Sequence, residues 1–550
     1  MEQARLFVAI ALSLLVFLLW NFFFVEKKPI QQPEEKREAT EVKEETITPE
    51  SIDSIDIEKD LATGFLSDGF KAERVIAIDT PLYTVMISAK GAVFKSFVLK
   101  DYRERVADGS PQKELISELI SEGTLQLGFQ SGRIPGLKDA VFSTNVEREM
   151  IKVSEKPEEI VFMWRSSDGI IVEKTFRFSP ETYLIDMRVN IKNASIQPFK
   201  DSLFLSLVSP PPTDTSAYGF EGPSAFIDNK LEQIKIKKIE DKSIYTGKVG
   251  WIALEDRYFM TSIIPQNSGE SGMHLFLNPD SVLKNQYMSP ESSIHPGAQG
   301  VYEFKLFFGP KSMNILNGLG YDLKRAIDFG WFDFIAKPCL WFMNFIYGFI
   351  PNFGFAIIIL TIVTKIVLWP LGTKSYKSMS EMKKIQPLMA EIREKHKTDK
   401  KKMNEELMGL YRVYKINPLG GCLPMIVQLP VFIALYRMLY EAIELRHAPF
   451  FWWINDLSAP DRLFRFGFDI PLMQPPYGIP VLTIIMGASM LLQQKMSPPP
   501  GDPNQAKMMM LMPIIFTFIF INFSSGLVLY WLVNNILSMA QQYYTTKKFS

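Results

Sequence analysis

The 550-residue chain has little of what metal binding and covalent catalysis require. Its two cysteines, Cys339 and Cys422, lie far apart in apolar stretches, so we expect neither a disulfide framework nor a zinc site. The four histidines are scattered singly, without metal-ligand spacing. We find no glycine-rich phosphate loop, nucleophile triad or carboxylate pair in a suitable context. The sequence therefore predicts neither a cofactor nor an enzymatic activity.

The chain also lacks a net charge, since 60 basic residues balance 60 acidic ones. Bulk charge therefore indicates no nucleic-acid or acidic partner, and only the distribution of charge is informative. The chain is too long for one domain, and 47% apolar with 13% aromatic residues suffices for both a soluble core and membrane spans.

The first 60 residues predict a membrane anchor and a tether. Residues 1–25 hold a 20-residue apolar run that is longer than the core of a signal peptide. Bulky residues such as Trp20 stand where a cleavage site would need small ones, which favours an uncleaved transmembrane anchor over a signal peptide. Residues 26–60 are rich in Glu, Lys, Thr and Pro, the composition of a flexible linker.

Residues 61–310 show the period of two that is typical of strands with one buried face. The clearest alternation runs over 183–192, and other expected strands cover 82–89, 93–99, 170–178, 202–208, 258–264 and 301–308. Many short strands with little helix predict a large antiparallel β-sandwich domain. Such sandwiches often bind sugars or peptides, but this one carries no catalytic constellation, so we expect a folded, exported domain without catalysis.

Residues 311–335 place apolar side chains at helical spacing among charged ones: Leu316, Leu319, Leu323 and Ile327. With Trp331 and Trp341 following, the pattern predicts an interfacial amphipathic helix on a membrane surface. A helix that merely caps the β domain is the alternative.

Residues 353–371 form an apolar segment of about 28 Å, long enough for a transmembrane helix, and contain one full charge, Lys365. In one interpretation Lys365 extends its side chain toward the headgroups, although Lys374, a marker of the interface, is about 13 Å further along the helix. In the other, Lys365 faces a wet cavity within the bundle, near Thr361 and Thr364. An intramembrane charge favours the functional hypothesis.

Residues 372–416 are strongly basic, with ten lysines and two arginines against six acidic residues, which predicts a cytoplasmic segment. Apolar residues recur at helical spacing on both sides of Asp399: Met379, Met382, Ile385, Met389 and Ile392, then Leu407, Leu410, Tyr411 and Tyr414. We expect a helical hairpin whose methionine-rich stripe is the seam between its helices, or else a docking surface.

Four further transmembrane helices are predicted at 419–440, 477–493, 508–523 and 526–544. The loop 441–476 has five acidic residues against three arginines and an aromatic belt at 450–453, so it belongs outside. The loop 494–507 and the C-terminal end carry lysines and belong inside. Six spans with both termini in the cytoplasm satisfy every loop. Polar residues within these spans favour a hydrophilic interior: Gln428, Thr517, Asn522, Asn534 and Asn535.

Five stretches of this sequence resemble the YidC membrane protein insertase family, in its Gram-negative form with a large periplasmic domain. They are LTIVTKIVLWPLGTKSY (360–376), NPLGGCLPMIVQLPVFIALY (417–436), ELRHAPFFWWINDLSAPD (444–461), QKMSPPPGDPNQAKMM (494–509) and SSGLVLYWLVNN (524–535). The resemblance covers the whole chain in architecture and the part after about Trp331 in detailed motif.

The resemblance implies an α+β membrane protein of the bacterial inner membrane, with a five-helix insertase core, an N-terminal anchor and a periplasmic β-sandwich domain. Its core helices would enclose a hydrophilic groove that is closed on the periplasmic side. Lys365 stands where the family usually has arginine, and lysine lacks the planar fork of a guanidinium. Thr361, Leu429, Phe432 and Trp531 match the residues along which substrates slide, and Trp531 stands where tyrosine is common. Gln428 and Asn534 complete the expected groove.

The implied function is insertion and folding of nascent membrane proteins in the lipid bilayer, alone or with the Sec translocon. Ribosomes or targeting factors would meet the cytoplasmic hairpin. Two other functions explain part of the pattern. A secondary transporter would also hold a charge at mid-membrane, but should show an internal repeat or paired broken helices. A membrane-anchored periplasmic carbohydrate-active enzyme would place a carboxylate pair in a cleft of the β domain.

Overall fold

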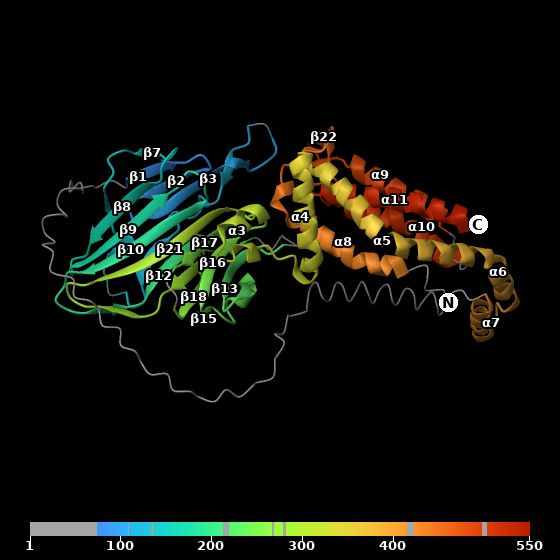
Figure 1. The fold of residues 1–550 in the computed structure, drawn as a ribbon, viewed down its shortest axis with the longest axis horizontal. Helices are drawn as coiled ribbons and strands as arrows, with labels where there is room; N and C mark the ends of the chain where they lie inside the picture. The colour runs from blue at the N-terminus through green and yellow to red at the C-terminus, as the bar shows by residue number, and fades with distance from the viewer. Residues whose placement is uncertain are drawn as a thin grey trace, which may run out of the picture.

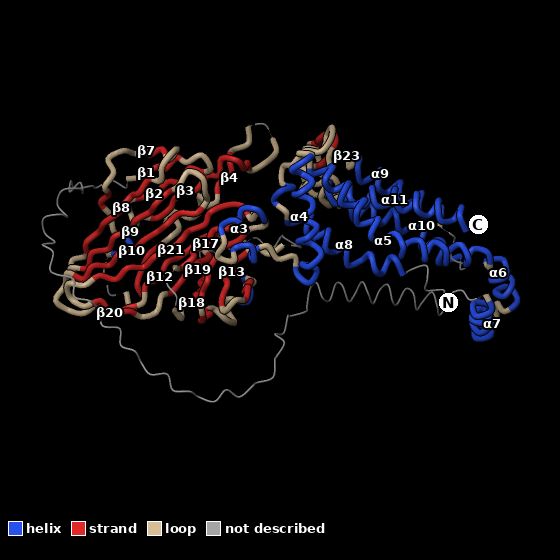
Figure 2. Tube along the Cα trace, in the orientation of Figure 1, coloured by secondary structure: helices blue, strands red, loops and turns tan. Residues whose placement is uncertain are grey.

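The computed structural model describes residues 74–107, 109–132, 134, 136–212, 219–266, 269–278, 282–414, 423–497 and 503–549. A β domain and a helical bundle lie at opposite ends of an elongated molecule, as Figure 1 shows, and Figure 2 shows that nearly all strands lie in the first and the long helices in the second. The predicted anchor (1–25) and linker (26–60) lie outside the described residues, as do residues 61–73 of the predicted β domain.

The β domain is built on one nine-stranded antiparallel sheet. Its order is β14 (Lys230–Gln233), β13 (Gly222–Ile227), β16 (Val249–Glu255), β17 (Phe259–Pro265), β21 (Gln299–Pro310), β10 (Leu184–Asn193), β9 (Ile170–Phe178), β8 (Glu158–Arg165) and β6 (Ser143–Thr144). The predicted alternation over 183–192 is confirmed, because successive side chains of β10 are buried and accessible in turn. Strand β9 has the predicted bounds, 170–178.

Two five-stranded sheets cover one face of the large sheet. One has the order β4 (Gln112–Glu114), β3 (Val93–Arg103), β2 (Tyr83–Ser88), β1 (Val75–Asp79) and β7 (Met150–Lys152), in which β1 and β7 are parallel. The other has the order β15 (Ile244–Gly247), β18 (Ser271–Leu277), β19 (Leu283–Met288), β12 (Leu203–Ser209) and β5 (Gln126–Phe129). A short pair, β11 (Phe199–Asp201) and β20 (Ser292–Ile294), completes the domain.

Aromatic contacts show that both smaller sheets lie on the same face. Phe304 and Phe308 are four residues apart on β21 and so point to the same side. Phe304 contacts Tyr287 of β19, whereas Phe308 contacts Phe94 and Phe97 of β3. Around β10 the opposite face carries ion pairs, such as Lys305 with Asp186, and remains accessible. The main core therefore lies between the large sheet and the two smaller ones, while along β13, β16 and β17 side chains on both faces of the large sheet are buried.

The side chain of Lys174 carries an ionisable group that is fully buried in that core. Lys174 of β9 donates from Nζ to three backbone carbonyl oxygens, those of Gly91 at 2.8 Å, Ala92 at 3.0 Å and Leu125 at 3.2 Å. It thereby ties the turn before β3 and the segment before β5 to the large sheet. Burial lowers the pKa of Lys174 to about 7.

The helical part begins with short elements and continues as a bundle. The short elements are α3 (Met313–Leu319), η3 (Leu323–Ala326), η4 (Gly330–Phe332) and η5 (Ile443–Leu445), and the long ones are α4 (Asp333–Phe349), α5 (Phe353–Lys384), α6 (Gln386–Lys395), α7 (Lys400–Val413), α8 (Leu423–Glu441), α9 (Val481–Met496), α10 (Pro503–Phe520) and α11 (Ser525–Phe549). Among the described helices, α5 is long and apolar enough to cross a membrane, and two shorter apolar helices cover Val481–Met496 and Lys507–Phe520.

The single amphipathic helix predicted over 311–335 is wrong. The chain forms three short helical pieces there, because Gly320 (φ 79°), Tyr321 (φ 52°) and Asp322 (φ 54°) adopt left-handed backbone conformations that end α3. Leu316 and Leu323 are nevertheless both fully buried. The apolar residues therefore belong to two separate short helices, α3 and η3, and not to one long helix. The long helix in this region is α4, which the sequence analysis missed.

The predicted segment boundaries after residue 353 need correction as well. Helix α5 begins at the predicted Phe353 but runs 13 residues beyond the predicted end, since a change from apolar to basic side chains marks an interface and does not end a helix. It ends at Lys384, just before α6, whose first turn contains Pro387. The predicted hairpin 372–416 therefore consists of the end of α5 together with α6 and α7. Its predicted seam is confirmed, because Ile385, Met389 and Leu407 form one buried cluster.

The span predicted over 477–493 begins four residues too early. Residues Tyr477–Ile479 form strand β23, which pairs with β22 (Leu463–Phe466), and α9 begins after Pro480. Asp461 fixes this start by accepting hydrogen bonds from the backbone N–H of Leu482 at 2.8 Å and from Thr483 Oγ1 at 3.1 Å. Helices α10 and α11 run from 503 to 520 and from 525 to 549, against predicted spans of 508–523 and 526–544.

Helices α9 and α10 approach closely at a glycine, which gives a first testable prediction. A Cβ added at Gly487 would overlap Thr517 Oγ1 and lie 3.0 Å from its Cγ2 and 3.1 Å from its Cβ. Because a β-branched side chain has little rotamer freedom in a helix, the backbones must separate. We expect Gly487→Ala to destabilise the protein by about 1–3 kcal/mol in thermal unfolding in detergent.

The matched control is Gly409→Ala in α7, where an added Cβ meets no heavy atom within 4 Å. This change should stabilise the chain by up to about 1 kcal/mol, since alanine is the better helix former. The double variant Gly487→Ala/Thr517→Ala should recover most of the loss. Equal melting temperatures for the two single variants would show that the helix contact at Gly487 is not tight.

Candidate functional site

The predicted site residues lie on three helices of the bundle, α5, α8 and α11. Helix α11 packs extensively against α5 and α9, whereas α8 packs mainly on α4 and touches α5 and α11 only slightly. Of these three helices, α8 therefore has the fewest close backbone contacts with the other two in the described part of the chain.

The predicted cation lies against a hydroxyl on the neighbouring helix. Lys365 of α5 is half-buried, and its Nζ donates to Ser538 Oγ of α11 at 2.6 Å. Within the part of the chain that the structure describes, no carboxylate forms an ion pair with this ammonium. Lys365 is thus a cation held by a neutral group, which leaves its charge uncompensated.

The two threonines near Lys365 do not face it with free hydroxyls. Thr361 is buried, and its Oγ1 donates to the backbone oxygen of Ile357 at 2.6 Å. Thr364 Oγ1 donates in the same way to the oxygen of Thr361 at 2.9 Å. Both hydroxyls satisfy their own helix, as threonine commonly does within membrane helices.

Phe432 and Trp531 meet at the centre of an aromatic cluster. Their rings are 4.6 Å apart in a T-shaped arrangement, and the Trp531 ring also contacts Phe520 of α10 at 5.1 Å. Tyr436 and Phe523 extend the cluster toward the β domain at 5.6 Å from each other. This cluster joins α8, α10 and α11 in the half of the bundle nearer the β domain.

The structure gives fewer contacts for the other predicted site residues. Gln428, Leu429 and Asn534 are all half-buried. Gln428 lies beside Tyr530 of α11. The neighbouring Asn535 is buried and donates from Nδ2 to Ser489 Oγ of α9 at 3.0 Å.

A polar stripe on α11 escaped the sequence analysis, which stopped at Asn535. Five side chains along one face of this helix are buried: Asn535, Ser538, Gln541, Gln542 and Thr545. Gln541 donates to the backbone oxygen of Trp369 in α5 at 2.8 Å, and Gln542 donates to that of Met496 in α9 at 3.0 Å. Their spacing of three or four residues was the signal that could have found them.

The stripe retains hydrogen-bonding capacity that the described residues do not use. The Oε1 atoms of Gln541 and Gln542 and Oγ1 of Thr545 have no partner among them. A buried polar atom without a partner costs about 1–3 kcal/mol. Water buried between helices is the usual partner of such atoms.

At the end of the bundle nearer the β domain, the segment between α8 and α9 is hydrogen-bonded to the turn after α10 and to the start of α11. Arg462 of this segment donates from Nη1 to the backbone oxygen of Ile521 at 2.9 Å and from Nε to that of Pro476 at 3.0 Å. Ser525 Oγ, at the start of α11, donates to the oxygen of Ala459 at 2.6 Å.

The described residues contain no group of histidine, cysteine or acidic side chains that could hold a metal ion.

Two family models and many relatives match the chain. Residues 75–342 match the model described as YidC periplasmic domain, and residues 345–550 match the 60Kd inner membrane protein model. A membrane protein insertase YidC from Syntrophus aciditrophicus is 40% identical over 98% of this chain and 99% of its own length. The chain belongs to the YidC membrane protein insertase family. A second relative of that description, from Syntrophobacter fumaroxidans, is 38% identical over 99% of this chain and its whole length.

A crystal structure titled active YidC insertase is 19% identical, with a TM-score of 0.38, and covers 88% of this chain and 94% of its own.

Family membership confirms the resemblance and decides among the functions considered. The protein is a membrane protein insertase with an α+β fold, and it resides in an inner membrane with its β-rich domain in the periplasm. Its substrates are nascent membrane proteins, which it inserts into the lipid bilayer. The family is defined by insertion and not by catalysis, which disfavours the transporter and the carbohydrate-active enzyme.

Proposed function

We propose that the insertase moves the translocated tail of a client through a hydrophilic groove between α8 and the helices α5 and α11. The groove opens toward the cytoplasm, is closed on the periplasmic side, and contains Lys365 as its cation. The predicted groove residues Thr361, Gln428, Leu429, Phe432, Trp531 and Asn534 line the path. Because Thr361 donates to its own helix, it contributes its methyl group and not its hydroxyl.

The observation that carries this proposal is the division of the bundle interior along α11. Rings surround Trp531 in the half nearer the β domain, and polar side chains from Ser538 to Thr545 are buried in the other half. A polar tail that enters from the cytoplasm would pass Lys365 and Ser538 first and the apolar closure around Trp531 afterwards. An apolar segment that follows it finds aromatic side chains and then lipid.

Insertion needs no cofactor or nucleotide under this proposal, and the protein is not an enzyme. An acidic tail that crosses lipid unaided carries a cost of about 2.5–3.5 kcal/mol for each central charge. A cation paired only with a hydroxyl can attract that tail halfway across. The hydroxyl of Ser538 holds the ammonium of Lys365 at α11 without neutralising it. The hydrophobicity of the client then releases it into the bilayer.

We also propose six transmembrane helices, with both termini in the cytoplasm, made by an anchor within 1–25 together with α5, α8, α9, α10 and α11. The lysines around α6 and α7, at the end of the bundle far from the periplasmic domain, support this orientation (Figure 1). The 16 residues of α9 span only about 24 Å, so the bilayer would thin beside the groove and shorten the path of the tail.

Two partners follow from the same orientation. The basic hairpin of α6 and α7 would meet ribosomes or targeting factors at the cytoplasmic face, because clustered lysines attract ribosomal RNA. For clients with long translocated domains the insertase would act beside the Sec translocon, since one narrow groove cannot pass a folded domain. Co-purification of stalled ribosomes, with and without charge reversal at Lys395 and Lys397, tests the first contact.

Site-specific photo-cross-linking to a stalled client tests the groove. We expect probes at Phe432 and Trp531 to give several-fold more cross-links to the client's apolar segment than a probe at Ile536. Ile536 is the matched control, because it lies on the same helix with half of its surface exposed on the outside of the bundle. Equal yields at all three positions would exclude a path between α8 and α11.

A further inference from the structure

The segment that leaves α8 is bound to the periplasmic domain by an arginine from that domain. Arg257, between β16 and β17, donates from Nε to the backbone oxygen of Tyr440 at 2.8 Å and donates to the same oxygen from Nη2. Its guanidinium carbon lies 3.4 Å from the centroid of the Tyr440 ring. Tyr440 belongs to the last turn of α8, where carbonyl groups have no partner within the helix. Arg257 supplies that partner and places a cation at the negative end of the helix dipole.

A second arginine binds in the opposite direction, from the bundle to the β domain. Arg446 donates from Nη2 to the backbone oxygens of Arg103 and Glu104, and its guanidinium carbon lies 5.3 Å from the centroid of the Phe259 ring. The burial of Arg446 lowers its pKa. Both arginines therefore connect the periplasmic domain to the segment 440–446. Arg257 comes from the periplasmic domain, and Arg446 comes from that segment.

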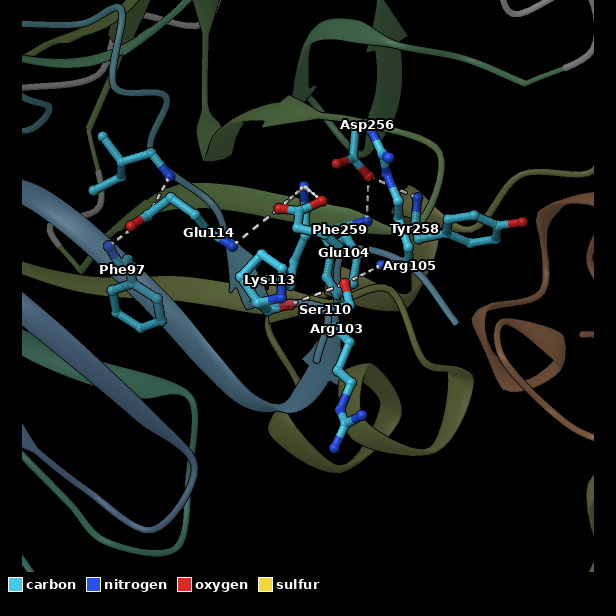
Figure 3. A network of polar contacts seen from close by, with 12 residues as sticks. Phe97, Arg103, Glu104, Arg105, Ser110, Lys113, Glu114, Asp256, Tyr258 and Phe259 are labelled. Atoms are coloured by element: carbon cyan, nitrogen blue, oxygen red, sulfur yellow. Dashed lines mark hydrogen bonds and ion pairs between the residues drawn. The ribbon is translucent and has the colours of Figure 1, made fainter. Parts of the chain in front are cut away.

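The turns that provide and receive these arginines are themselves braced, as Figure 3 shows. Asp256 accepts hydrogen bonds from the backbone N–H groups of Tyr258 at 2.7 Å and Phe259 at 2.6 Å, which fixes the turn that carries Arg257. Glu104 is held by Lys113 at 3.2 Å, which fixes the turn that receives Arg446. The attachment is thus preorganised on the side of the β domain.

A buried carboxylate adds a third contact within the same segment. Glu444 accepts hydrogen bonds from Ser312 Oγ at 3.2 Å and from the backbone N–H of Met313 at 3.3 Å. These residues begin α3, directly after the last strand of the periplasmic domain. Burial raises the pKa of Glu444. Three polar contacts therefore converge on the seven residues 440–446.

Among the three groove helices, α8 has the fewest close backbone contacts with the other two in the described residues. It packs on α4, which itself follows the β domain in the chain, and it contacts α5 and α11 only slightly. Its groove residue Phe432 faces Trp531 across that weak contact. Whatever holds the periplasmic end of α8 therefore influences the width of the groove.

We propose that Arg257 is a positioning residue for insertion, through which the periplasmic domain holds the end of α8 and sets the separation of α8 from α11. The inference rests on the proposed groove for its effect on insertion, but the attachment itself does not depend on that groove. Ordinary packing between domains, without influence on the groove, is the competing explanation. It predicts that loss of Arg257 leaves both α8 and insertion unchanged.

Three variants of the full-length protein in lipid nanodiscs test the proposal by hydrogen exchange. In Arg257→Ala we expect amides in the last two turns of α8 to exchange about tenfold faster, because the end of the helix loses its partner. Arg257→Lys should give an intermediate rate, since an ammonium keeps the charge but cannot provide the planar fork that stacks on Tyr440. The matched control is Arg188→Ala, which removes an arginine that pairs with Glu303 on the accessible face of the large sheet.

Insertion of a client with an acidic tail should fall about threefold in Arg257→Ala, fall less in Arg257→Lys, and stay unchanged in Arg188→Ala. Unchanged exchange in α8 for Arg257→Ala would overturn the attachment. Faster exchange with unchanged insertion would overturn the positioning role. If probes at Phe432 and Trp531 fail to cross-link clients, the proposed groove fails instead, and the exchange rates still report on the attachment.

Discussion

Insertion of a client with an acidic translocated tail should fall tenfold or more when Lys365 is changed to Gln. Opposite charges about 8 Å apart attract by about 2 kcal/mol at an effective dielectric constant of about 20, and 1.4 kcal/mol corresponds to tenfold. Lys365→Glu should be more severe because it repels the tail, whereas Lys365→Arg should restore insertion. Depletion of the native protein, rescue with each variant, and protease protection of the client measure the effect.

Two controls separate charge from structure in this experiment. Ser538→Ala keeps the cation and removes only the hydroxyl that holds it, so insertion should fall much less than in Lys365→Gln. A client whose acidic residues are replaced by amides should be inserted equally well by the wild type and by Lys365→Gln. If Lys365→Gln inserts the acidic client normally, the ammonium only reaches toward the headgroups. Hydration and a thinned bilayer would then carry insertion.

The stability of the periplasmic domain should increase as the pH rises from about 7 to about 10, because of Lys174. Its pKa is lowered from 10.5 to about 7 in the folded chain, so the unfolded state binds more protons across this range. Below about pH 7 both states are protonated, and the folded state bears the full cost of burying the charge. The difference in the pKa of Lys174 between the folded and unfolded states corresponds to about 5 kcal/mol in the free energy of unfolding. Most of this stability is recovered by pH 10.

Hydrogen exchange of the β9 and β10 amides in the full-length protein measures this pH dependence after correction for the intrinsic rate. Lys174→Met is the appropriate comparison, since it removes the titrating group and should abolish the slope. That variant should also be less stable at pH 8, because three carbonyl oxygens lose their donor at about 1–3 kcal/mol each. A slope that persists in Lys174→Met would show that another group titrates.

Several features of the fold could be predicted because they rest on local patterns. The alternation along β10 reports one buried face, and the repeat around Met389 reports the seam of the hairpin. Helix ends were harder to predict, because composition marks where the surroundings change and not where backbone hydrogen bonding stops. The basic end of α5 and the strand before α9 are both examples.

The sequence by itself determined the family, the presence of a cation in an apolar helix, and the division into a β domain and a bundle. Each depends on residue types at fixed spacing along one segment. Only the tertiary structure decided that Lys365 is held by Ser538, that the polar face of α11 continues to Thr545, and that Arg257 caps α8. These contacts join residues more than 170 positions apart, and no local periodicity encodes which distant donor meets which acceptor.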